Sequence, residues 1–313
     1  MSIKRPPSIV AIALTALTAL TLAACQPAEQ VEEPAEAVPP INLVEVTVFD
    51  FAFKAPDQIP SGWTTLRVKN AGKQEHFALL QRLPEGKRID DYGAEVGAVF
   101  GEVWERYSAG EIDRDGAGQA LGQQLPEWFF AELVPSGGVA ITEPGATSQS
   151  TVHLEPGIYV MECYVKTPGG VWHTMLGMVH EITVTADASD ASPPDADAEL
   201  TLSNYQIAVS GELAAGTNTV AVHVVDTPEG MMAHDINLFR LDEGVDVDEI
   251  VAWMDWMDLD GFRAPAPGYS LGGVEHLAAG ATGYMTVDFK PGRYAWVSEG
   301  YGAQGVALEF TIE

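Results

Sequence analysis

Short segments in which apolar residues alternate with polar ones, or run together, recur along most of the chain. Residues 44–53 (VEVTVFDFAF), 64–70 (TTLRVKN) and 76–83 (HFALLQRL) have this pattern, and Gly, Pro or Asn turns separate many such segments. Residues 150–165 and 178–186 continue it. Short strands at this spacing predict a sandwich or barrel of roughly seven strands, so the fold class is expected to be all-β.

Two stretches have the period of an amphipathic helix instead. The first contains apolar residues three or four positions apart, namely Val96, Val99, Phe100, Val103, Trp104 and Tyr107. The second is shorter and contains Ile250, Val251, Met254 and Met257. Such stripes are expected to pack against a sheet, so each predicts a helical insertion.

The chain repeats itself. HFALLQRLPEG begins at His76 and HDINLFRLDEG begins at His234, and residues 144–159 match residues 279–294 without a gap. Similar blocks in the same order predict an internal duplication. We therefore expect one Greek-key β-sandwich over residues 42–185 and a second over residues 199–313, each with one helical insertion.

Two segments lack the apolar residues needed for a core. Residues 25–41 are rich in Pro, Ala and Glu, and residues 186–198 (ADASDASPPDADA) separate the two repeats. Such compositions are typical of extended, flexible segments. We interpret the first as a tether and the second as a linker.

Residues 1–24 have the layout of a signal peptide. Lys4 and Arg5 precede an apolar run that is too short to span a bilayer comfortably, and the run ends in Leu22-Ala23-Ala24-Cys25. This ending resembles the lipobox of bacterial lipoproteins. The resemblance implies cleavage before Cys25, lipidation of its thiol, and a protein held at a membrane of the cell envelope, facing the periplasm or the exterior.

The charge excludes one class of partner. The chain has 16 Lys and Arg against 45 Asp and Glu, a formal net charge of −29. Such a field repels nucleic acid; it could steer a basic protein partner, or serve only solubility. No Ser-His-Asp signature, phosphate loop or dinucleotide-binding motif is present, so the sequence does not predict an enzyme.

The cysteines indicate which chemistry the chain could perform. The chain has two, and if Cys25 carries lipid, no intramolecular disulfide can form. Cys163 is then either a buried, inert thiol or a metal ligand. In the first repeat it has donor residues on both sides in the chain, with His76 before it and His173 and Met178 after it.

This order of His, Cys, His and Met resembles the cupredoxins, the small blue copper proteins. The flanking stretches NAGKQEH (70–76) and PGIYVMEC (156–163) are similar to motifs of that family. The resemblance implies one copper ion, held by His76, Cys163, His173 and Met178 at one end of the first sandwich. Two imidazoles, a thiolate and a distant thioether suit both Cu(I) and Cu(II).

The loop between Cys163 and His173 is longer than is usual in cupredoxins. TPGG at residues 167–170 is a turn signal. If the chain folds back there, antiparallel pairing should place Cys163 nearly opposite His173 or Thr174.

The second repeat lacks most of these donors. Alignment places Ser298 at the position of Cys163 and Val306 near that of Met178, and only His234 is retained. A hydroxyl does not replace a thiolate for copper. We expect a degenerate, metal-free second domain and one copper per chain.

The resemblance therefore implies an exported, lipid-anchored copper protein that transfers electrons, with a redox protein as partner. Two alternatives remain open from the sequence alone. The same ligands could store or deliver copper, or the fold could serve as a metal-free interaction or scaffold module.

Overall fold

The computed structural model describes residues 41–227 and 232–313. The predicted signal peptide, most of the tether and Cys25 lie outside these residues, so their assignment stays a prediction. None of the helices in the described ranges has both the length and the hydropathy needed to cross a membrane.

Eight strands in the first half of the chain form two sheets. They are β1 (Leu43–Phe49), β2 (Ala52–Lys54), β3 (Gln58–Asn70), β4 (His76–Arg82), β5 (Val134–Thr142), β6 (Thr147–Leu154), β7 (Gly157–Glu162) and β8 (Val179–Ala188). One sheet has the order β2-β1-β3-β6. The other has the order β3-β8-β7-β4-β5, because the first residues of β3 pair in parallel with β8. The chain crosses between the sheets after β3, β5 and β6, which is the connectivity of a Greek-key sandwich.

Eight further strands repeat this arrangement. They are β9 (Ala198–Ser203), β10 (Gln206–Gly211), β11 (Gly216–Val224), β12 (His234–Leu241), β13 (Tyr269–Leu277), β14 (Thr282–Phe289), β15 (Gly292–Val297) and β16 (Ala307–Ile312). Each pairing within this set has a counterpart in the first set. For example, β9 and β11 pair in parallel, as β1 and β3 do, and β15 and β16 pair antiparallel, as β7 and β8 do. The predicted all-β class is confirmed, with eight strands per repeat rather than seven.

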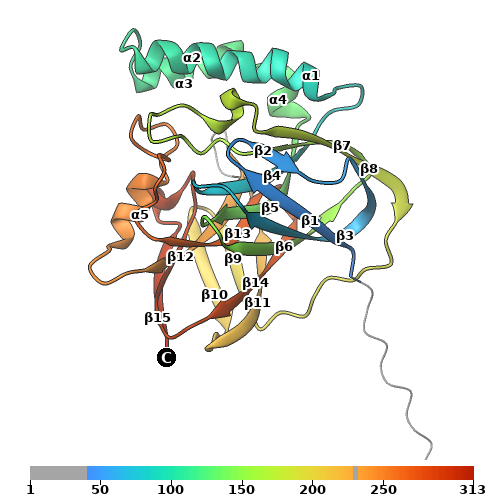
Figure 1. Cartoon of the computed structure of the whole chain (residues 1–313), viewed down its shortest axis with the longest axis vertical. Coiled ribbons are helices and arrows are strands. Elements are labelled where there is room, and N and C mark those ends of the chain that lie inside the picture. Colours follow the sequence, from blue (N-terminus) through green and yellow to red (C-terminus); the bar gives the residue numbers. More distant parts are fainter. Residues whose placement is uncertain (1–40, 228–231) are drawn as a thin grey trace, which may run out of the picture. The chain divides into compact units, whose positions relative to one another are not determined.

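Helices are inserted at the same point of both repeats. Between β4 and β5 lie α1 (Ile89–Tyr92), the π-helical turn η1 (Gly93–Gly97), α2 (Ala98–Ser108), α3 (Arg114–Gln124) and α4 (Glu127–Ala131); between β12 and β13 lies α5 (Val247–Trp253). The structure therefore confirms the two predicted insertions, and α2 and α3 pack side by side (Figure 1). Val96 and Val103 of the predicted stripe are buried, with Leu121 of α3 and Trp128 of α4 in the same cluster.

The two sets of strands join along their edges. β5 pairs with β13, and β6 pairs with β14, both antiparallel. Each pairing supplies hydrogen-bond partners to a strand that would otherwise be a sheet edge. The described residues, 41–227 and 232–313, accordingly belong to one compact unit. The proposed boundary between two domains stays an interpretation; β8 ends at Ala188 and β9 begins at Ala198.

A pair of glycines lies in the middle of β5 (Gly137-Gly138) and of β13 (Gly272-Gly273). Gly138 and Gly273 have φ of +132° and +145°, and a Cβ at either position would lie 2.0 Å from the carbonyl oxygen of Ala78 or Ile236. Only glycine lets β5 and β13 approach β4 and β12 this closely.

Candidate metal centre

His76 lies at the start of β4, and side-chain hydrogen bonds of Asn70 hold the loop that precedes it. The Asn70 side chain donates from Nδ2 to the carbonyls of Gln74 and Thr142, both at 2.8 Å, and accepts the N–H of Gly72 at 2.9 Å. The loop that delivers His76 is therefore anchored to β5. This explains why an Asn and a Gly precede the histidine.

Cys163 and His173 come from the two arms of one excursion between β7 and β8. Cys163 follows β7 directly, and His173 begins the 3₁₀ turn η2 (His173–Leu176). The chain folds back near Pro168 as predicted, but the expected register is wrong. The bridge pairs Lys166 with Trp172, and the N–H of His173 donates to the carbonyl of Val165.

The side chains of Cys163 and His173 approach each other because of the turn η2 and not because of strand pairing. Pairing stops at His173 because the chain turns there into η2, which carries the ring back toward the sulfur. Met178 then returns to the strand, and its carbonyl accepts the N–H of Cys163 at 3.3 Å.

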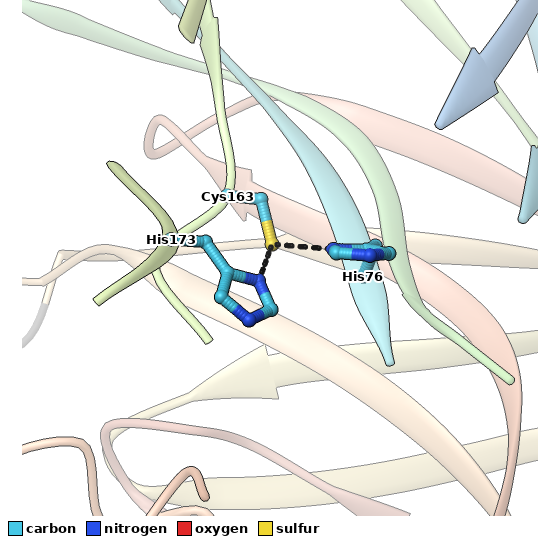
Figure 2. Close-up of side chains that lie close together, drawn as sticks. All are labelled: His76, Cys163 and His173. Atoms are coloured by element: carbon cyan, nitrogen blue, oxygen red, sulfur yellow. Dashed lines mark hydrogen bonds between the residues drawn. The ribbon is translucent and has the colours of Figure 1, made fainter. Parts of the chain in front are cut away.

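The side chains of His76, Cys163 and His173 converge (Figure 2). The Sγ atom of Cys163 lies 3.7 Å from Nδ1 of His76 and 3.6 Å from Nδ1 of His173. All three residues are fully buried, at 0% exposure. A sulfur atom and two imidazole nitrogens therefore face one another away from water.

Each ring is oriented by a partner on its other nitrogen. His76 Nε2 lies 2.9 Å from Oδ1 of Asp50, and His173 Nε2 lies 3.2 Å from Oε1 of Gln74. Both partners are acceptors, so each Nε2 carries the proton and each Nδ1 presents its lone pair toward Cys163. Outer partners of this kind are typical of metal-binding histidines.

Burial sets the protonation of the three groups. It lowers the pKa of His173 to about 3, with His76 adding to the effect. It also lowers the pKa of His76, which the Asp50 carboxylate partly offsets. Burial raises the pKa of the Cys163 thiol well above its usual range. Both imidazoles are thus neutral near pH 7, and only a bound cation would favour the thiolate.

The spacing fits one shared ion. Bonds of about 2.3 Å to sulfur and about 2.0 Å to nitrogen, arranged in a trigonal plane, put the sulfur about 3.7 Å from each nitrogen. The observed separations are 3.7 and 3.6 Å. The two sulfur–nitrogen separations therefore already match those of a shared ion, and one ligand atom from each of the three residues lies within 4.8 Å of the others.

Met178, the fourth candidate from the sequence, is joined to this cluster by backbone hydrogen bonds. Met178 is fully buried, and its N–H donates to the carbonyl of His173 at 3.1 Å, so it is the neighbour of both Cys163 and His173 in the backbone network. Met175 is 42% exposed and packs against Gly101 of α2. His153 and His180 lie beside Glu155 and Asp57, outside the cluster.

The second repeat has a different set of residues at the matching positions. The N–H of Ser298 donates to Val306, as Cys163 donates to Met178, and the N–H of Val306 donates to Tyr301, as Met178 donates to His173. Ser298 and Val306 thus occupy the aligned positions of Cys163 and Met178.

Tyr301 occupies the position of His173, and its ring lies 5.3 Å from that of His234. Sequence alignment missed this equivalence because the hairpin before Tyr301 is shorter. The second repeat therefore offers one imidazole and no thiolate at these positions.

Comparisons with known proteins give the following similarities. No protein-family model matches the chain, and no curated protein matches it. Among solved structures, auracyanin from Roseiflexus castenholzii has 21% sequence identity and a TM-score of 0.26, over 46% of this chain and 97% of that one. Auracyanin A from Chloroflexus aurantiacus, a blue copper protein, has 20% identity and a TM-score of 0.27, over 46% and 99%.

A multicopper oxidase is also similar, with 13% identity and a TM-score of 0.24 over 87% of this chain and 89% of that one. TM-scores this low support no inference about the function of this chain. The strand pairing and the side-chain geometry described above do not depend on these similarities.

The metal-free protein should lose stability in acid because of His173. Its folded-state pKa of about 3 lies below the unfolded value of about 6.5, so the unfolded state binds more protons between these values. The free energy of unfolding should therefore fall as the pH drops from about 6 to about 4. The contribution of His173 to this slope should be about 1.4 kcal/mol per pH unit.

Urea unfolding of the wild type and of His173→Gln at several pH values isolates this contribution. The variant lacks the titrating ring, so its stability should depend less steeply on pH by about that amount. Equal slopes for the two proteins would contradict a buried, neutral His173.

Proposed function

We propose that the first repeat binds one copper ion through His76, Cys163 and His173 and that the protein transfers single electrons. The observation that supports this best is the buried sulfur with an imidazole Nδ1 at 3.7 Å on one side and another at 3.6 Å. A trigonal Cys-His₂ set with a weak axial thioether is the donor set of blue copper electron-transfer sites. When bound, the copper would supply a reversible one-electron couple.

The donor count favours copper over structural zinc. Structural zinc sites are closed by four strong ligands, commonly Cys and His. Among the described residues, only His76, Cys163 and His173 form the cluster at this position. The remaining neighbour is Met178, whose thioether is a soft, weak donor suited to the axial position. Met178 as a fourth ligand is part of the proposal.

The chain holds its ligands in place without the metal. Asn70 anchors the loop before His76, and Asp50 and Gln74 fix the two ring planes. Ligands fixed in this way would change little between oxidation states, which favours rapid electron transfer. Delivery of copper to another protein requires ligands that reach the surface, whereas these are 0% exposed. We therefore favour electron transfer over copper storage or delivery.

A surface for a redox partner lies beside His173. Val171, Met175 and Leu176 are apolar and are 44%, 42% and 45% exposed. They belong to the same short excursion as His173, so a partner that covered them would approach the metal ligand closely. An electron carrier needs such a contact because transfer rates fall steeply with distance.

We also propose that Cys25 carries lipid and holds the protein at a membrane of the cell envelope. The support is the Leu22-Ala23-Ala24-Cys25 sequence after a signal-like segment. Cys25→Ser should abolish lipidation and release the protein from membranes, as measured by fractionation in the native host. Unchanged membrane association of the variant would contradict the lipid anchor.

Copper binding should depend on Cys163 and not on the second repeat. The metal-free wild type should bind one Cu(I) per chain in competition with a Cu(I) chelator, because the thiolate is the soft ligand. Oxidation should then produce an intense thiolate-to-copper absorption band in the visible region. Cys163→Ser should lose this band and weaken Cu(I) binding strongly, because a hydroxyl is a poor ligand for Cu(I).

His234→Ala is the matched control, because His234 occupies in the second repeat the position of His76 in the first. It should bind Cu(I) and develop the band as the wild type does. Loss of Cu(I) binding in His234→Ala, with Cu(I) binding retained in Cys163→Ser, would show that the copper site belongs to the second repeat.

A further inference from the structure

Three polar side chains of the second repeat lie close together in the sheet that contains β12. Asp235 is the second residue of β12, and the strands that pair with β12 on its two sides bring His276 and Glu299 beside it. His276 Nε2 lies 3.9 Å from Oδ1 of Asp235 and 4.0 Å from Oε2 of Glu299. All three residues are buried, at 1%, 5% and 5% exposure.

The cluster contains polar atoms without partners. His276 Nε2 and Glu299 Oε1 are buried and accept or donate no hydrogen bond. Within residues 41–227 and 232–313, no lysine or arginine forms an ion pair with Asp235 or Glu299. Native proteins rarely leave buried polar atoms unpaired, because desolvation without compensation is unfavourable. A bound cation would supply the missing partner for His276 Nε2 and Glu299 Oε1, whereas Asp235 already accepts hydrogen bonds from the hydroxyl of Ser298 and the N–H of Glu299.

Outer contacts orient the cluster as they do in metal sites. Asp235 accepts the backbone N–H of Glu299 at 3.1 Å, and the hydroxyl of Tyr164 donates to Glu299 Oε2 at 3.1 Å. His276 Nδ1 faces Oε2 of Glu275 at 3.9 Å. This separation is too long for a hydrogen bond, and Nε2, which has no hydrogen-bond partner, is the nitrogen that faces Asp235 and Glu299.

The first repeat shows that the fold does not need polar residues at these positions. Asp235 is aligned with Phe77, because His234 is aligned with His76. The Gly-Gly pairs and the Cys163–Ser298 alignment place His276 and Glu299 at the positions of Ile141 and Tyr164. The counterparts are thus apolar or aromatic, and the rings of Phe77 and Tyr164 pack 4.7 Å apart. The acidic and imidazole side chains of the second repeat therefore call for an explanation beyond packing.

We propose that Asp235, His276 and Glu299 form a second metal site, for a divalent ion of the Mn²⁺ or Fe²⁺ type. Two carboxylates balance the charge of one divalent ion, which makes burial of the complex tolerable. Oxygen ligands with one imidazole suit hard or borderline ions and not Cu(I). Ligand atoms about 2.1 Å from one ion lie about 3 to 3.5 Å apart, so each of the two separations of 3.9 and 4.0 Å needs to close by about 0.4 to 1 Å.

The structure also provides access. A cavity of about 390 Å³ is lined by His276 and Tyr164, with Met232 and Glu162 in the same wall. An ion could enter by this route, and a position of its coordination shell would face the cavity. Three protein ligands with one position open to a cavity are typical of reactive rather than structural metal sites.

Mn²⁺ binding to the full chain tests the proposal, with free Mn²⁺ followed by electron paramagnetic resonance. The metal-free wild type should bind one Mn²⁺ per chain, and so should Cys163→Ser, because Mn²⁺ does not require the thiolate. Mutation of a residue that only hydrogen-bonds to a metal ligand typically lowers metal affinity by about 10- to 100-fold. Glu299→Gln and His276→Gln change the ligands themselves, so each should weaken Mn²⁺ binding by at least about 100-fold. Glu75→Gln, which alters a buried carboxylate outside the cluster, should bind as the wild type does.

Crystals of the wild type soaked in Mn²⁺ provide a readout that needs no variant. Anomalous scattering should place one ion between Asp235, His276 and Glu299. The proposal is overturned if the wild type binds no Mn²⁺, if both ligand variants bind it with wild-type affinity, or if the anomalous peak lies elsewhere. Because Cys163→Ser removes the thiolate but not this cluster, the outcome is independent of whether the first repeat binds copper.

Discussion

The buried sulfur of Cys163 has an imidazole nitrogen on either side, and most of the local structure serves this contact. At 3.6 and 3.7 Å, each sulfur–nitrogen contact is a weak hydrogen bond at best. The geometry leaves the lone pairs of both Nδ1 atoms facing one thiol, which has a single proton to donate. A proton can satisfy only one of the two nitrogens, whereas one metal ion satisfies both and stabilises the thiolate.

The surrounding structure makes this arrangement rigid. Asn70 ties the loop before His76 to β5, and Gly72 is required because a Cβ there would lie 2.9 Å from His76 Nε2. The backbone bonds between Cys163 and Met178, and between Met178 and His173, join the remaining candidates into one network. The two repeats then share a continuous pair of sheets, so this end of the first sandwich is supported by the second.

The sequence predicted the all-β class, the repeated strand order and the three residues that converge. It could do so because alternation, turn residues and the order of His, Cys and His are local or motif-level signals. It did not predict the register between Cys163 and His173, because the 3₁₀ turn that begins at His173 replaces pairing that the turn signal alone would continue. It also missed α3 (Arg114–Gln124), whose small and polar residues give a weak apolar stripe.

The cluster of Asp235, His276 and Glu299 could not be predicted from the sequence, for another reason. Its members belong to three separate segments and meet only because β13 and β15 lie on the two sides of β12. Asp50 and Gln74 likewise reach the rings only through the folded loops. The two repeats thus have one framework and different polar residues. Strand pairing, rather than a sequence motif, decides which of these residues meet.

X-ray absorption at the copper edge of the loaded protein, in both oxidation states, tests the central claim most directly. The account predicts one sulfur at about 2.3 Å and two nitrogens at about 2.0 Å, with the same ligands after reduction. A copper ion without a short sulfur bond, or one that gains or loses a nitrogen ligand when its oxidation state changes, would contradict it.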